Sequence, residues 1–364
     1  MQSNGIDFGV STGVFNPSTF VGAATGTLNN EQMISDTNTF ISTWKTNAAV
    51  AATATVQLPL VSTGTYNFWV DWGDGQKDYV TSFAQIYVRE TVARTHTYRT
   101  VGTYTIRITG VCRGWSFFGL TNEKPKIQSI ERFGCLELIN DTTNGQQFSA
   151  CINLDLSNVR DTLSTKYLTN MLALLSSSPN LNVNLFNNWD VSKMTNISSV
   201  FFNCTNFNNQ IGNWNVGNAT SMFNLFINNT TFNQDISNWD VSNVTNMSSM
   251  FSGTTAFNID IGSWNMSKVT DMSFMFNGAI AFNQDIGNWN IGLVTNISNF
   301  MLGKTPSTFS AANLDAIYNG WSSRPSQSNL SITFGTANYT IAGGSIGRAI
   351  LVSRGWTIVD GGGI

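Results

Sequence analysis

Carboxylate side chains that recur at one repeat position are the first candidates for chemistry in this chain. They are Asp235, Asp260 and Asp285. In a parallel stack of repeats, equivalent residues lie about 4.7–4.9 Å apart, and like charges at that spacing repel unless a cation or water intervenes. The column is therefore interpreted first as a solvated edge at which neighbouring Asn and Ser side chains share the hydrogen bonding. A ladder of Ca²⁺ sites is the alternative.

A second column of Asp and Asn lies one residue after each repeated tryptophan. Its members are Asp190, Asn215, Asp240, Asn265 and Asn290. The amides interrupt the carboxylates, which relieves repulsion and is typical of a structural ladder. Repeat proteins commonly bind ligands on the surface that their aligned strands form. If the repeats bind a ligand, we expect these five side chains to contact it.

The rest of the chain lacks the residue patterns of known catalytic sites. We find no Ser/His/Asp order, nucleophile elbow, phosphate loop or zinc spacing, so no catalytic residue and no cofactor other than Ca²⁺ is predicted. The single histidine, His96, has no nucleophile or metal ligand placed beside it by motif, which favours a structural role. Asp74 is the central residue of a Gly-Asp-Gly turn, and Asp71 is separated from this turn by one residue. Asp in such a turn usually bonds its own backbone; Ca²⁺ binding there is the alternative.

The four cysteines have no CxxC spacing and are expected to be buried free thiols. They are Cys112, Cys135, Cys151 and Cys204. A Cys135–Cys151 disulfide is the alternative.

The elements that position these columns come from an internal repeat. Tryptophan recurs every 25 residues, at Trp189, Trp214, Trp239, Trp264 and Trp289. The alternation at Trp-x-Val predicts a strand, and Thr-x-Met-x-x-Met-Phe, as in 270–276, predicts one or two helical turns with Thr as N-cap. Phe-Asn then closes each coil. Because no coil can bury its apolar face alone, the coils must stack, with Trp, Phe and Met in the core and the Asn column bonding the backbone at the turns.

Different patterns flank the repeats. Upstream, 66–72 and 101–109 alternate in polarity and border turns, which predicts strands. Downstream, the pattern predicts helices over 311–321 and 345–354 and a strand over 355–359. We therefore divide the chain into an N-terminal arm and potential anchor (1–36), a β-sandwich (37–134), a stack of coils (135–302) and a C-terminal cap (303–364).

Two motifs carry a resemblance to known families. Trp72-Gly-Asp-Gly with His96-Thr-Tyr resembles PKD-like domains, which are immunoglobulin-like sandwiches. The Trp-Asp-Val-Ser-x-Val-Thr-x-Met-x-x-Met-Phe repeats with their cap resemble the BspA-like surface proteins, which occur in bacteria, mycoplasmas, viruses and phages. The resemblance implies a mainly β fold with short helices: an Ig/PKD-like β-sandwich, a leucine-rich-repeat-like α/β solenoid and a C-terminal α/β cap. It also implies adhesion or recognition rather than catalysis.

Composition narrows the function further. Charged residues are 11% of the chain, well below the roughly 25% of ordinary soluble domains, which suits an exterior protein. The net charge of −3 argues against nucleic-acid binding. The sequence contains no run of about 18 consecutive apolar residues, so we expect no membrane insertion. The N-terminus begins at Met1 without a signal-peptide pattern, which favours assembly onto a particle over secretion.

The leading hypothesis from the sequence is therefore a non-enzymatic protein of the virion surface, such as a phage fibre, spike or capsid decoration protein. Its arm and sandwich would contact other virion or surface proteins, its solenoid would bind a host-surface glycan or protein, and it would form a homo-oligomer if it serves as a fibre. The alternative is a bacterial cell-surface or secreted extracellular adhesin. A third and more remote hypothesis is a glycan-active enzyme that uses the aligned carboxylates.

Overall fold

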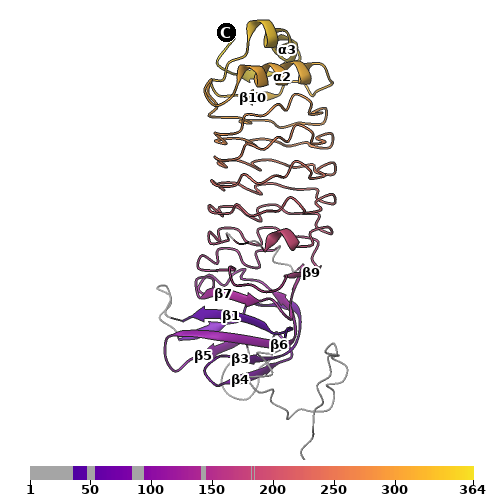
Figure 1. Ribbon diagram of the computed structural model, residues 1–364. Coiled ribbons are helices and arrows are strands. Elements are labelled where there is room, and N and C mark those ends of the chain that lie inside the picture. Colours follow the sequence, from indigo (N-terminus) through magenta and orange to yellow (C-terminus); the bar gives the residue numbers. More distant parts are fainter. Residues whose placement is uncertain (1–35, 47–53, 84–93, 141–144, 182, 184) are drawn as a thin grey trace, which may run out of the picture.

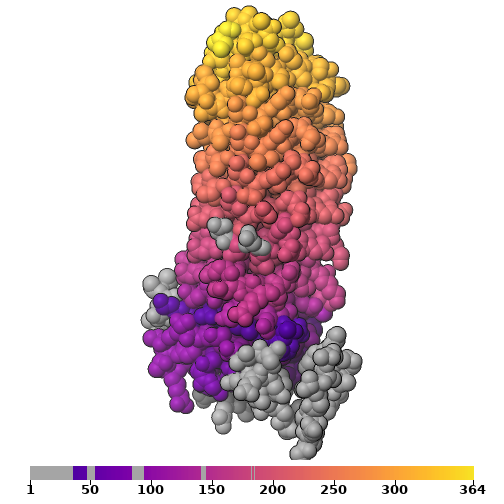
Figure 2. All heavy atoms as spheres, viewed as in Figure 1, coloured from indigo at the N-terminus to yellow at the C-terminus, as the bar shows by residue number. Residues whose placement is uncertain are grey.

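The molecule is elongated, with a β-rich N-terminal unit, a stack of coils and a helical cap at the C-terminal end (Figure 1). The computed structural model describes residues 36–46, 54–83, 94–140, 145–181, 183 and 185–364. The predicted arm at 1–36 thus lies outside the described residues, apart from its last residue. In the space-filling view, the stack adjoins the N-terminal unit at one end and the cap at the other (Figure 2).

The N-terminal unit is built on one large sheet, in which five strands follow the order β4-β3-β6-β1-β7 with antiparallel pairing. These strands are β1 (Phe40–Lys45), β3 (Leu60–Asp71), β4 (Lys77–Val80), β6 (Thr103–Trp115) and β7 (Ile127–Arg132). A second sheet pairs β2 (Thr55–Gln57) with β5 (Thr95–Thr97). The strands predicted at 66–72 and 101–109 are confirmed as β3 and β6, and their alternate residues, such as Phe68 and Val70, are buried.

The large sheet continues across the predicted boundary into the first coils. β8 (Leu136–Ile139) pairs with β6 and β9 (Ser164–Tyr167) pairs with β8, both in parallel. The guanidinium of Arg113 on β6 joins the three strands, because it donates to Glu137 at 2.8 Å and to the Tyr167 hydroxyl at 2.9 Å. One hydrophobic core runs from the sheet through the coils to the cap. The N-terminal unit therefore covers the first coil, which would otherwise expose its apolar interior.

Backbone hydrogen bonds between successive coils hold the stack together. In a representative coil, the N–H groups of Met247, Ser249 and Phe251 donate to carbonyls of the next coil at 2.8–3.0 Å. In the other direction, the N–H of Thr245 donates to the Thr220 carbonyl of the preceding coil at 2.8 Å. Because both directions are used, each inner coil satisfies backbone groups on its two neighbours.

The helix predicted at Thr-x-Met-x-x-Met-Phe is wrong. Ser249 has φ of 55°, so the chain turns tightly, and the N–H of Met250 bonds the Met247 carbonyl three residues back. This geometry aims alternate N–H groups at the next coil instead of along a helix axis. Within the described residues of the coils, the only helical element is the short 3₁₀ turn η2 (Phe186–Asn188). The predicted α/β character of the coils is therefore wrong, because their described residues form mainly turns that isolated parallel β-bridges join from coil to coil.

The strand predicted at Trp-x-Val is also wrong. The N–H of Trp264 bonds the Ile261 carbonyl at 3.1 Å and closes a turn there. The parallel bridges between coils lie elsewhere, at a position represented by the Asn246–Asp271 bridge. The repeated Trp and Val side chains do point inward as predicted, but a turn places them there.

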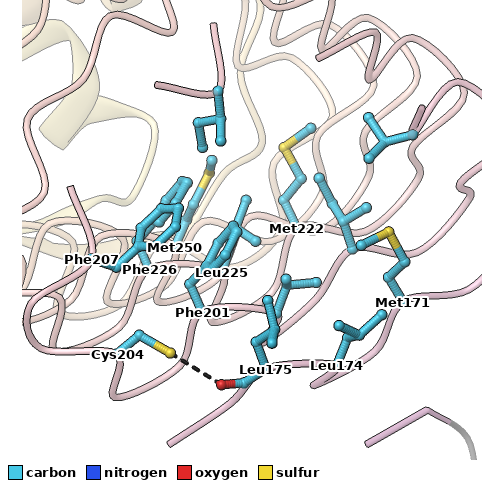
Figure 3. Close-up of a cluster of buried hydrophobic side chains, with 14 of the residues drawn as sticks. Met171, Leu174, Leu175, Phe201, Cys204, Phe207, Met222, Leu225, Phe226 and Met250 are labelled. Atoms are coloured by element: carbon cyan, nitrogen blue, oxygen red, sulfur yellow. Dashed lines mark hydrogen bonds between the residues drawn. The ribbon is translucent and has the colours of Figure 1, made fainter. Parts of the chain in front are cut away.

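Aromatic and sulfur-containing side chains fill the interior in columns, as the repeat predicts. Trp214 and Trp239 stack with ring centroids 6.3 Å apart and planes 2° from parallel. Figure 3 shows how Leu, Met and Phe side chains from successive coils pack together, with the Cys204 thiol donating to the Leu175 carbonyl. The indoles also make a ladder, because Nε1 of Trp264 donates to the Ile236 carbonyl in the preceding coil at 3.3 Å.

The predicted Asn column is present and is called the Asn ladder below. Its members are Asn208, Asn233, Asn258 and Asn283. The side-chain oxygen of each member accepts the backbone N–H of the next, at 2.8–3.0 Å. At the C-terminal end, the N–H of Ser310 donates to the oxygen of Asn283 at 2.9 Å, so the cap continues the ladder.

The cap consists of α2 (Ala311–Ser322), β10 (Ser331–Thr333), α3 (Ile341–Ser353) and β11 (Thr357–Val359). Both predicted helices and the last strand are confirmed, although α3 begins before the predicted residue 345. The cap imitates another coil, because Trp321 Nε1 donates to the Ile286 carbonyl at 3.1 Å and the Met301 N–H bonds Thr333 of β10 at 3.0 Å. The buried ammonium of Lys304 donates to three main-chain carbonyls of the preceding coil, which closes the stack.

Candidate functional site

The five side chains predicted to contact a ligand are exposed at equivalent positions of successive coils. They are Asp190, Asn215, Asp240, Asn265 and Asn290. In each, one side-chain oxygen accepts the backbone N–H two residues ahead, at 3.0–3.2 Å. Each side chain thus caps its own turn. One oxygen of each is used in this bond, and the side chains of the column still face solvent.

Hydrogen bonding stabilises the ionised form of the acids in this column. The hydroxyl and backbone N–H of Ser192 lower the pKa of Asp190, and those of Ser242 lower the pKa of Asp240. Both groups therefore stay anionic at any ordinary pH. Neither has the raised pKa that a carboxylic acid needs to donate a proton in glycoside hydrolysis.

A row of exposed threonines accompanies this column and was not among the residues predicted to bind. Its members are Thr169, Thr195, Thr220, Thr245, Thr270 and Thr295. Each hydroxyl from Thr195 onward donates to the carbonyl of the preceding member at 3.0–3.2 Å. The sequence signal for this row is the Thr six residues after each repeated Trp, a position that the helical pattern of the repeat assigns to an N-cap instead. The row adds hydroxyl groups to the same polar surface.

The three acids of the alternative Ca²⁺ ladder are also exposed and cap turns. Asp235 accepts from the Ser237 N–H and hydroxyl, and Asp260 and Asp285 accept from the N–H groups of Gly262 and Gly287, at 2.7–2.9 Å. The hydroxyl and N–H of Ser237 lower the pKa of Asp235. Among the residues that the structure describes, no three His, Cys, Asp or Glu side chains gather as a group that could hold a metal ion. Each of these carboxylates thus makes the turn hydrogen bonds expected of a solvated edge.

In the N-terminal unit, the predicted turn and the histidine do meet. His96 Nε2 lies 2.9 Å from Asp74, and its ring stacks on Trp72 at 4.8 Å. Burial raises the pKa of Asp74, but the hydrogen bonds from His96 and the Gln76 N–H outweigh burial and lower it overall. Asp71 caps the same turn through the Gly73 N–H at 2.9 Å. These contacts give His96 and both acids structural roles.

All four cysteines are buried free thiols, as predicted, so the alternative Cys135–Cys151 disulfide is absent. Burial raises the pKa of Cys135 and Cys204 to about 12. At neutral pH these sulfurs are protonated and unreactive.

The surface also has a depression that the sequence did not indicate. It has a volume of about 460 Å³ and is lined by Pro179, Asn180, Asn206, Asn208 and Thr231. It lies at the N-terminal end of the Asn ladder, where the chain before Asn208 carries no equivalent Asn in register.

The comparisons with known proteins concern the coils. Residues 143–238 and 213–315 match the family model described as Mycoplasma protein of unknown function, DUF285, and this match fits a BspA-like surface repeat protein. No curated protein and no solved structure matches the chain. The N-terminal unit lies outside the matched residues. Among the described residues, no helix has the length and apolar character required to cross a membrane.

Proposed function

We propose that this chain, with its BspA-like repeats, is a non-enzymatic surface protein whose coil stack presents a polar face for recognition. The observation that carries the proposal is the pair of exposed polar columns along the stack, formed by the Asp and Asn side chains after each repeated Trp and by the threonine row. Backbone hydrogen bonds between coils hold these columns in place, and the N-terminal unit and the cap cover the two ends of the stack. Rigid, aligned polar groups favour binding because little side-chain entropy is lost on contact.

Finer structural assignments belong to the same proposal. We propose that the N-terminal unit is an immunoglobulin-like sandwich of the PKD type, supported by the antiparallel order β4-β3-β6-β1-β7 and by the packing of His96 on Trp72. We propose that the coils form a solenoid related to leucine-rich repeats, in which turns and ladders replace regular strands and helices. The N-terminal unit would then attach the molecule, and the solenoid would extend away from the attachment point.

Two settings fit such a molecule. The virion surface is the one expected from the low charge of the chain, which suits a fibre, spike or decoration protein. A bacterial cell surface is the second candidate, favoured by the match to a family described from Mycoplasma. In both settings the partner of the stack would be a host-surface glycan or protein.

Immuno-electron microscopy of the native source, combined with mass spectrometry of the labelled fraction, tests the proposal. Label on particles supports the virion setting, and label on cell envelopes supports the adhesin. Label confined to the cell interior would contradict both. As a second measurement, purified chain should bind intact host cells, and binding should persist after substitution of Asp235 and Asp260 by Asn, since a surface-recognition role needs no acid at these positions.

A further inference from the structure

The Asn ladder is closed at one end and open at the other. At the cap, the Ser310 N–H bonds the oxygen of Asn283, and Asn313 Nδ2 donates to the same oxygen. At the opposite end, none of the hydrogen bonds among the described residues uses the backbone N–H of Asn208. The ladder thus offers a donor where the oxygen of one more Asn would lie.

This open end coincides with the depression of about 460 Å³, a volume within the range of about 300–1,000 Å³ of small-molecule sites. Asn180, Asn206 and Asn208 bring three carboxamides to it. The Asn180 amide nitrogen donates to the Ile152 carbonyl at 3.2 Å, which leaves its oxygen available. The Asn206 side chain has no hydrogen bond within the described part of the chain.

The chemistry of the lining selects a ligand class. No side chain with an ionisable group is among the described residues that line the depression, so charge does not favour an anionic or cationic ligand. A carboxamide both donates and accepts, which matches the paired hydroxyls of a sugar. The half-buried Pro179 ring offers a small apolar surface on which the C–H face of a pyranose can pack.

We infer that the depression at the open end of the Asn ladder binds a neutral saccharide unit, with a sugar hydroxyl accepting from the Asn208 N–H in place of the missing ladder oxygen. This inference rests on the proposed function and names the class of ligand that the surface recognises. Asn206 and Asn208 hold the ring hydroxyls, and Thr231 borders the site one coil further on.

The repeats supply a well-matched variant for the test. Equivalent positions to Asn206 in the downstream coils hold Ala256 and Ala281, so Asn206→Ala introduces a side chain that this fold already accepts. It should leave the thermal midpoint unchanged and weaken saccharide binding tenfold or more. Saturation-transfer NMR and calorimetry on the full chain, with a panel of neutral mono- and disaccharides and with glucuronate as the charged comparison, measure the effect.

A second pair separates binding from stability. Asn208 accepts from the Asn233 N–H and the Gln234 side chain, both at 3.0 Å, and Asn258 accepts from Asn283 and Gln284 at 2.8 and 2.9 Å. Asn208→Ala and Asn258→Ala therefore lose the same ladder contacts, but only the first lies at the depression. We expect equal losses of thermal stability and at least tenfold weaker binding for Asn208→Ala alone.

Absence of saturation transfer from every neutral saccharide, or equal transfer to wild type and Asn206→Ala, would overturn the saccharide inference. Stronger binding of glucuronate than of its neutral counterpart would overturn it as well. None of these results bears on where the native protein is found, which is the measurement that decides the proposed function. Loss of surface labelling, conversely, would leave a measured saccharide affinity intact.

Discussion

The indole ladder allows a stability prediction in which the chain provides its own control. Trp264→Phe removes the bond from Nε1 to the Ile236 carbonyl. That carbonyl keeps a second donor, the Trp239 N–H at 3.1 Å, so the lost bond costs about 0.5–1.5 kcal/mol and no acceptor is left unpaired. The smaller ring loses buried apolar area worth on the order of 1 kcal/mol. Together these terms predict a loss of about 2 kcal/mol.

Trp189→Phe is the matched control, because this tryptophan occupies the same repeat position and is equally buried, at 3% exposed against 4% for Trp264. Its Nε1 is buried and has no hydrogen-bond partner among the described residues. The substitution loses the same ring area but relieves an unpaired donor, which costs about 1–3 kcal/mol where it is buried. We expect Trp189→Phe to be close to neutral or stabilising.

Equilibrium unfolding in guanidinium chloride, followed by far-ultraviolet circular dichroism, measures both variants without relying on tryptophan emission. The prediction concerns the difference between them, about 2 kcal/mol or more in favour of Trp189→Phe, at unchanged denaturant dependence. Equal losses, or a larger loss for Trp189→Phe, would refute the view that indole–carbonyl bonds between coils stabilise the stack.

Three further predictions concern buried and titrating groups. Asn229 is fully buried and its amide has no partner among the described residues, whereas the equivalent Thr254 donates to the Phe226 carbonyl. Asn229→Thr should therefore raise the free energy of unfolding by about 1–3 kcal/mol and Thr254→Asn should lower it, as measured by denaturant titration; a loss for Asn229→Thr would show that its amide is satisfied. The lowered pKa values of Asp235 and Asp240 mean that the folded state binds fewer protons than the unfolded state. Their contribution is thus present above the ordinary Asp pKa of about 3.9 and is lost as the pH falls through their folded-state values. Thermal midpoints between pH 5 and pH 2 should decline less steeply when both acids are replaced by Asn, and an identical decline would contradict this. Because turn N–H groups already occupy the Asp235 and Asp260 carboxylates, EDTA and added Ca²⁺ should leave the thermal midpoint unchanged; a rise of several degrees with Ca²⁺ would restore the calcium ladder.

The spacing of residues predicts which side chains fill the interior better than it predicts the local conformation of the backbone. A tryptophan every 25 residues requires a stacked core whatever the local conformation, so the buried columns, the Asn ladder and the need for a cap could be inferred. The apolar pattern of Met247, Met250 and Phe251 fits a helix, but it fits equally a chain of tight turns whose bonds run to neighbouring coils. The sequence feature that distinguishes the turns from a helix is a small or amide residue at the position of Ser249, where φ is positive. The next coil has Phe274 at this position, with φ of 55°, so the feature is not repeated there.

The structure adds a second candidate for ligand binding to the polar face of the stack. Sequence alone indicates only the column of Asp190 and Asp240, because aligned polar residues are the visible feature of a repeat. In the structure those oxygens already accept from their own turns, so a ligand there would have to compete with bonds that shape the coil. At Asn208, in contrast, a ladder ends at the surface with its N–H unused by the described residues and a depression beside it. In a periodic structure, each polar group bonds the equivalent group of the neighbouring coil. This pairing is lost only where the repeat becomes irregular. Irregular coils next to regular ones are therefore where we expect ligand-accepting groups in proteins of this architecture, and a repeat consensus averages such positions away.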